Sequence, residues 1–150
     1  MDKQQEKNFR VLADGLLNLP VNYKHFNMSI YLRHSGGCGL TAGDLPPSKG
    51  KRVVNCGTVG CAAGHGPSFG IKVKKGESWA GYVERVFTDG DDKIYRWCFH
   101  QLWADCDNTP QGAALRILYM LDYGIPEDFS IWTPEKHKTL YTNAYDVVTV

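Results

Sequence analysis

Apolar positions recur with the spacing of an α-helix in several stretches of the chain. Residues 3–18 carry apolar side chains three or four positions apart and end before Pro20, which predicts an N-terminal helix. Residues 77–87 carry a similar stripe after Ser78, a residue type that caps helix N-termini. Residues 94–105 place large apolar side chains on two faces, and we expect helical structure there as well.

The clearest helical signal lies in residues 109–123. Thr109 is suited to cap this helix, Pro110 fits a first position that needs no amide hydrogen, and Gly124 ends it. The middle of the segment is apolar nearly all round, and its one charged residue is Arg116. A helix that is apolar on every face belongs in the interior, so the pattern predicts a central helix.

Other stretches are less regular. Apolar and polar residues alternate in residues 25–32, which favours a short strand. Residues 35–52 are rich in Gly, Pro and Lys and predict a long loop. Residues 55–64 predict a short helix of small residues that Asn55 caps and glycine stops. The tail after Glu127 could add a strand.

These elements predict the fold class. We expect a mainly α protein, with α+β as the alternative: a single compact domain of residues 1–150 in which about five helices surround residues 109–123. The expected β contribution is minor.

Composition and charge narrow the class of protein. Hydrophobic residues make up 43% of the chain and charged residues 22%, which indicates a globular fold. The net charge of +1 argues against a nucleic-acid-binding protein, and no apolar run is long enough to span a membrane. The first ten residues lack a signal-peptide pattern, and five cysteines are an odd number. We therefore expect a cytoplasmic protein with free thiols.

Two motifs resemble those of a known group of proteins. The stretch C-G-T-V-G-C-A-A-G at 56–64 and the stretch D-N-T-P-Q-G-A-A-L-R-I at 107–117 are similar to motifs of small uncharacterised bacteriophage and prophage proteins. Phe26-Asn27-Met28 matches a third element of that group, and the resemblance covers about three-quarters of the chain. It implies a phage or prophage origin, and so a bacterial cytoplasm, but no particular activity.

Two chemical hypotheses concern the cysteines and histidines. A thiol at a helix N-terminus has a lowered pKa, which makes Cys56 a candidate nucleophile of a hydrolase or transferase, with His100 or His25 as its base. A structural zinc site is the second hypothesis, because Cys61 and His65 are four residues apart. Its candidate ligands are Cys56, Cys61, His65, Cys98, His100 and Cys106.

A third hypothesis is an anion or partner site. Basic residues flank the predicted helix at 55–64 on both sides, and the amides of its first turn could hold a phosphate. The basic residues are Lys49, Lys51, Arg52, Lys72, Lys74 and Lys75. The alternative is that these side chains are solvated loop residues.

Core packing is the interpretation that the residues favour. Free cysteine behaves as a small hydrophobe, and the glycines at 57, 60 and 64 would let the predicted helix approach Ala113 and Ala114 closely. Arg116 needs a buried partner, and the candidates are Asp105, Asp107 and Asp122. The alternative for Arg116 is an anchor for an acidic ligand. The patterns around His25, His34 and His137 indicate no role.

The function that we expect is binding without a cofactor. The leading hypothesis is a phage accessory protein that engages a host or phage protein, for example in counter-defence, through the 35–52 loop and its neighbouring lysines. The thiol-dependent enzyme and the zinc domain are the alternatives.

Overall fold

The computed structural model describes residues 1–20, 23, 26–28, 32–34, 58–130 and 135–145, and at 32–34 and 58–60 it describes the backbone alone. These residues are mainly helical, which confirms the predicted fold class. The α-helices are α1 (Lys3–Leu17), α2 (Trp79–Val83), α3 (Asp92–Phe99), α4 (Pro110–Tyr123) and α5 (Glu135–Ala144). Shorter helical turns are η2 (Ala63–Phe69), η3 (Glu84–Thr88) and η4 (Gln101–Asp105), and the strands are β1 (Leu32–His34) and β2 (Thr58–Gly60).

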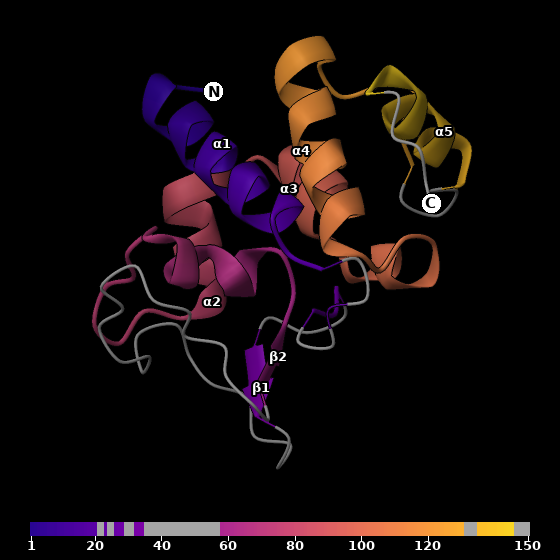
Figure 1. Ribbon diagram of the computed structural model, residues 1–150. Helices are drawn as coiled ribbons and strands as arrows, with labels where there is room; N and C mark the ends of the chain where they lie inside the picture. The colour runs from indigo at the N-terminus through magenta and orange to yellow at the C-terminus, as the bar shows by residue number, and fades with distance from the viewer. Residues whose placement is uncertain (21–22, 24–25, 29–31, 35–57, 131–134, 146–150) are drawn as a thin grey trace.

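The helix α4 lies at the centre of the helical part of the molecule, as its sequence predicts (Figure 1). It packs against α1 on one side and α5 on the other, and α3 lies behind it. The two short strands lie together at the end of the molecule away from the N-terminus. None of the helices in the described part of the chain has the length and apolar character that a membrane crossing needs.

Side-chain caps explain where the main helices begin. The Asp2 carboxylate accepts a hydrogen bond from the Gln5 amide at 2.7 Å, and the Gln5 side chain accepts one from the Asp2 amide at 2.8 Å. This reciprocal capping box fixes the start of α1. The Ser78 hydroxyl accepts from the Gly81 amide at 3.1 Å and starts α2, and Thr109 caps α4 in the same way. Local sequence therefore dictates these helix starts.

The predicted helix at 55–64 is wrong over Thr58–Gly60. These residues form β2, which pairs antiparallel with β1 so that Val59 lies opposite Arg33. Two β-branched residues flanked by glycines favour an extended backbone over a helix, and a strand partner elsewhere in the chain completes the pairing. Helical structure begins only at Ala63, in the tight turn η2, and it continues through Pro67.

Two other predictions differ from the structure. The tail does not add a strand at residues 135–144, which form α5 because His137 and Tyr141, four residues apart, are both buried on one helical face. The alternating stretch at 25–32 contributes only Leu32 to β1 among its described residues.

The helix against which the turn η2 packs also differs from the expected one. The turn η2 packs against α1, whereas Ala113 and Ala114 belong to the central helix that α1 covers. A Cβ atom added at Gly15 would lie 2.6 Å from the ring of Phe69, so the absence of a side chain in α1 is what admits that ring. A glycine in α1 therefore permits this approach, and Gly57 of the predicted set lies outside the described residues.

The buried side chain of Gln5 ties α1 to η3. Its amide nitrogen donates to the Phe87 carbonyl at 3.0 Å while its carbonyl oxygen serves the capping box. One turn later Asn8 donates to the Val86 carbonyl at 2.8 Å. Both carbonyls lie near the C-terminal end of η3, where a helix leaves its last carbonyls without an intrahelical donor, and the two side-chain amides satisfy them.

We predict that Gln5→Glu destabilises the protein by about 2 kcal/mol at neutral pH, because it removes a donor to a buried carbonyl and places a carboxylate beside it. Gln4→Glu makes the same change at an exposed position in the same helical turn and should have almost no effect. Urea unfolding followed by tryptophan fluorescence measures both. Equal midpoints for the two variants would contradict the role given to Gln5.

Candidate functional site

The one charged residue in the middle of α4 is completely buried. Arg116 has no exposed surface, and its Nη1 atom lies 3.7 Å from Asp107 Oδ2. The same nitrogen donates to the Tyr141 hydroxyl at 3.2 Å, and that hydroxyl donates to Asp107 Oδ2 at 2.8 Å. Arg116, Asp107 and Tyr141 thus form a closed polar triangle that joins α4, the turn before it and α5.

Aromatic rings close the space around this triangle. The guanidinium carbon of Arg116 lies 4.3 Å from the ring centroid of Trp103, a cation–π distance. The Trp97 indole donates to the Arg116 carbonyl at 2.7 Å. Asp107, one of the three partners expected from the sequence, lies beside Arg116. The alternative role of Arg116, an anchor for an acidic ligand, is not favoured, because its side chain has no exposed surface.

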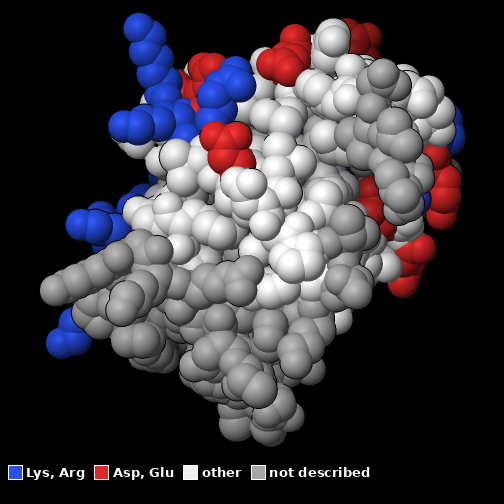
Figure 2. All heavy atoms as spheres, in the orientation of Figure 1, with Lys and Arg blue, Asp and Glu red and all other residues white. Residues whose placement is uncertain are grey.

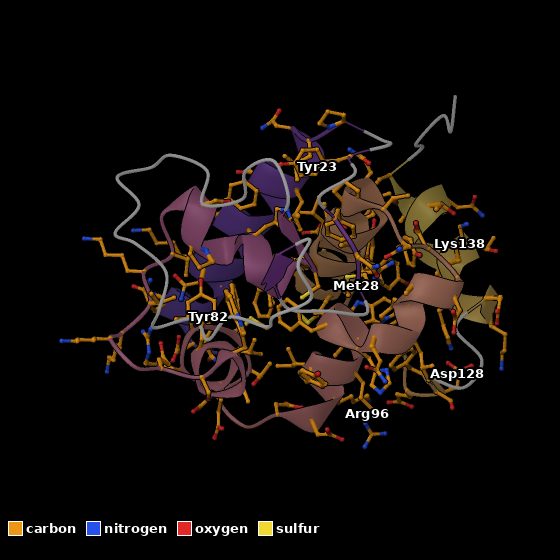
Figure 3. The ribbon with its side chains drawn as sticks, turned by 90° about the horizontal axis from the view of Figure 1, so that it is seen from below. Tyr23, Met28, Tyr82, Arg96, Asp128 and Lys138 are labelled. Atoms are coloured by element: carbon orange, nitrogen blue, oxygen red, sulfur yellow. The ribbon has the colours of Figure 1, made fainter. Side chains whose placement is uncertain are left out.

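The residues of the 107–117 motif have structural roles. The Thr109 hydroxyl donates to Asp107 Oδ1 at 2.7 Å and accepts from the Gly112 amide at 3.0 Å. A Cβ atom at Gly112 would lie 2.0 Å from the Asp107 carboxylate, so glycine leaves the space that this carboxylate fills. Asn108 accepts from the Met28 amide at 2.7 Å, which joins this motif to the Phe-Asn-Met element. Met28 lies near the middle of the molecule in the view from below (Figure 3).

Cys61 and His65 belong to the interior. Cys61 is 2% exposed and His65 is 1% exposed, and burial raises the pKa of the Cys61 thiol to about 11. The His65 Nδ1 atom lies 2.8 Å from the Cys61 carbonyl, which can only accept, so Nδ1 carries the hydrogen. The Phe26 ring packs 5.7 Å from the imidazole, centroid to centroid. The Phe-Asn-Met element therefore also packs at the end of the 56–64 stretch.

The other described thiols are also poorly suited to attack. Cys98 is fully buried, donates to the Met120 sulfur at 3.7 Å, and has its pKa raised by burial. Cys106 is half-buried, and burial followed by the nearby Glu135 raises its pKa. A nucleophilic or metal-binding thiol needs the opposite shift, toward the thiolate. None of Cys61, Cys98 and Cys106 forms a disulfide.

His100 serves as a cap between two helical segments. Its Nδ1 atom accepts from the Leu102 amide at 3.1 Å where η4 begins, and burial lowers its pKa. Among the described residues, no three His, Cys, Asp or Glu side chains are grouped to hold a metal ion. The structure does not bring together the described members of the predicted zinc set, which are Cys61, His65, Cys98, His100 and Cys106.

Several predicted site residues lie outside the described residues. They are His25, Lys49, Lys51, Arg52 and Cys56, together with the whole of the 35–52 stretch. The nucleophile hypothesis for Cys56 and the first half of the basic patch therefore remain predictions.

The second half of the basic patch lies beside a surface hollow. Lys72, Lys74 and Lys75 are exposed in the segment after η2, and Lys72 lines an open depression of about 500 Å³. The depression lies between α1, the end of η2 and η3. Its lining residues are Gln4, Lys7, Asn8, Val11, Phe69, Gly70, Ile71, Lys72, Arg85 and Val86, and we call it the basic hollow. Basic side chains gather over α1 and along the same side of the molecule, at the left of Figure 2.

The charge of the basic hollow is positive and partly compensated. Three of its lining residues are cations, and none of those lining residues is acidic. Arg85 makes two hydrogen bonds of 2.8 Å to the Glu77 carboxylate, and these bonds lower the pKa of Glu77. Within the described part of the chain, no carboxylate lies within ion-pair distance of Lys7 or Lys72. These two ammonium groups give the hollow its net charge.

Sequence reasoning identified only one wall of this hollow. Lys72 belongs to the predicted patch, whereas Lys7 and Arg85 were not singled out. Lys7 and Val11 are four residues apart and lie on the same face of α1. This pairing of a cation with an apolar residue was the one sequence feature that could have indicated a binding surface there. The packing of α1 against η2 and η3 was not visible in the sequence.

A second, smaller depression of about 280 Å³ has acidic walls. Asp91 caps α3 by accepting from the Lys93 and Ile94 amides, and Asp92 pairs with Arg96. Asp91 and Asp92 are thus used within α3, the third lining carboxylate is Glu84 of η3, and none of the lining residues is basic, so the depression is not comparable with the basic hollow.

The chain was compared with models of protein families, with curated proteins and with solved structures, and none of them matches it. The functional interpretation therefore rests on the residues and their geometry.

His137 is a buried titratable group with a distinct environment. It is 2% exposed, and neither ring nitrogen has a hydrogen-bond partner among the described residues. Its imidazole packs edge-on against Phe129 and Trp97, with ring centroids at 5.2 and 6.0 Å. Burial lowers its pKa, and the charges of Asp128 and Lys136 act on it in opposite directions.

We predict that protonation of His137 lowers the free energy of unfolding at acid pH. Because the pKa of His137 is lower in the folded state, the unfolded chain binds the proton first, and stability falls as the pH drops below about 6.5. His137→Phe should flatten the decline of the unfolding free energy between about pH 7.5 and pH 5 more than His100→Gln does. An unchanged decline in His137→Phe, measured by urea unfolding at each pH, would contradict this assignment.

Proposed function

We propose that this chain is a binding protein of phage or prophage type, and that it engages a host or phage protein in the bacterial cytoplasm, for example in counter-defence. The observation that supports the proposal is the basic hollow, where Lys7 and Lys72 stand without a described acidic partner beside exposed apolar surface. Isolated surface lysines are common, but a concave cationic surface of this volume offers an acidic partner both charge and shape.

The remaining candidate chemistry supports a structural assignment. The described thiols at Cys61 and Cys98 are buried, and the 107–117 motif is occupied in holding Arg116. Enzyme action through Cys56 and zinc binding through Cys56 are not favoured by any observation on the described residues. Most described residues that carry the resemblance have structural contacts inside the fold, so we look to the surface for recognition.

The proposal predicts that a partner binds through the basic hollow. An affinity-tagged form, cross-linked in bacterial extract, should retain a protein that mass spectrometry identifies and that binds again in purified form with equal stoichiometry. Lys7→Glu/Lys72→Glu should weaken this binding at least about tenfold, because it reverses two charges that face the partner. Lys93→Glu/Lys136→Glu makes the same charge change in the first turns of α3 and α5, outside the hollow, and should bind normally.

Two outcomes would contradict the proposal. Failure of the wild-type chain to retain any protein that binds again in purified form would exclude the binding function as stated. Equal binding by the two double variants would place the binding surface elsewhere on the molecule.

A further inference from the structure

The residues that line the basic hollow indicate which kind of ligand it can bind. Its floor is apolar, formed by Ile71 and Val86, which are 7% and 5% exposed, and by the half-buried ring of Phe69. Val11 is 36% exposed and adds apolar surface from α1. A ligand that fills the hollow therefore needs apolar groups as well as negative charge.

The cations occupy different walls around this floor. Lys7 lies in the second turn of α1, and Lys72 lies in the segment that follows η2. Arg85 is held by Glu77 and also donates to the Lys72 carbonyl at 3.0 Å, so its guanidinium fixes the segment that presents Lys72. The two lysines that remain uncompensated thus stand on walls that two separate elements supply. An occupant with two separated negative charges would contact both.

We infer that the basic hollow binds an acidic peptide segment of a partner protein in which apolar side chains alternate with carboxylates. This inference rests on the proposed function and adds the chemistry of the partner. The apolar side chains lie on Phe69 and Val11, and the carboxylates contact Lys7 and Lys72. A volume of about 500 Å³ accommodates a few side chains and exceeds what a single inorganic anion requires.

A nucleic acid fits these observations less well. Phosphate-backbone recognition depends on many cations along a path, whereas this hollow presents two uncompensated lysines and the whole chain has a net charge of +1. The apolar floor would remain uncovered by a phosphate backbone. Nucleic acid is therefore an outcome that the test must distinguish, and not the proposal.

The test is a titration of the ¹⁵N-labelled full chain, followed by amide chemical shifts. The probe is an end-blocked peptide of sequence Glu-Leu-Glu-Leu-Glu-Leu, and the matched control peptide replaces every Glu with Gln. An oligothymidylate of similar length tests nucleic acid. We expect the acidic peptide to shift the amides of Asn8, Gly70, Ile71 and Lys72, with an affinity at least about tenfold higher than that of the Gln peptide.

Variants separate the hollow from general charge effects. The double variant Lys7→Glu/Lys72→Glu should bind the acidic peptide at least about tenfold more weakly than the wild type. The control variant Lys93→Glu/Lys136→Glu should bind it with unchanged affinity. The spectrum of each variant shows directly whether its fold is kept. Added salt should weaken the binding, because the contacts are exposed ion pairs.

The inference is overturned if the acidic peptide leaves these amides unshifted, if the Gln peptide binds equally well, or if oligothymidylate binds more tightly. Such a result leaves the proposed function separately testable. A purified partner that loses affinity for Lys7→Glu/Lys72→Glu would still establish the hollow as the binding surface, with a different partner chemistry. If instead the peptide binds but no partner is retained, the proposed function fails and the site chemistry stands.

Discussion

A buried guanidinium constrains how α4, α5 and the turn before α4 pack together. Arg116 sits on the central helix without exposure to solvent, and an unpaired charge there would cost several kcal/mol. Asp107 supplies the opposite charge from the turn before α4, and Tyr141 supplies a hydroxyl from α5. Because the Nη1 atom of Arg116 contacts both of these groups, the positions of α4, α5 and the turn at 107 are coupled. The ring of Trp103 lies over this guanidinium, and Trp97 packs edge-on against Trp103.

The same constraint accounts for the sequence motifs. Thr109 orients Asp107, Gly112 leaves room for its carboxylate, and Asn108 holds the backbone at Met28. Cys61 and His65 fill the interior near Phe26. Sequence patterns with glycine, cysteine and histidine suggest chemistry, but here the described members pack the core. The proposed recognition therefore belongs to the surface, where α1 and the segment after η2 enclose the basic hollow.

The helices were predictable wherever a capping residue is followed by apolar residues at helical spacing, as after Ser78 and Thr109. The strand at Thr58–Gly60 was not, because its pairing with β1 depends on a distant segment. Helix α5 was missed because it carries few apolar residues. The sequence named Asp107 among three possible partners for Arg116, and only the fold distinguishes them. The basic hollow could not be read from sequence, because Lys7, Lys72 and Arg85 meet only when α1 packs on η2 and η3.

A double-mutant cycle on Asp107 and Arg116 tests the coupling most directly. Asp107→Asn and Arg116→Met each leave one buried group without its charge partner and should each lower the unfolding free energy by about 3 kcal/mol or more. The double variant removes both charges, so its loss should be smaller than the sum of the two single losses by at least about 2 kcal/mol. Urea unfolding followed by tryptophan fluorescence measures all four proteins. Losses that add to within about 0.5 kcal/mol would contradict the account, because the two charges would then be independent.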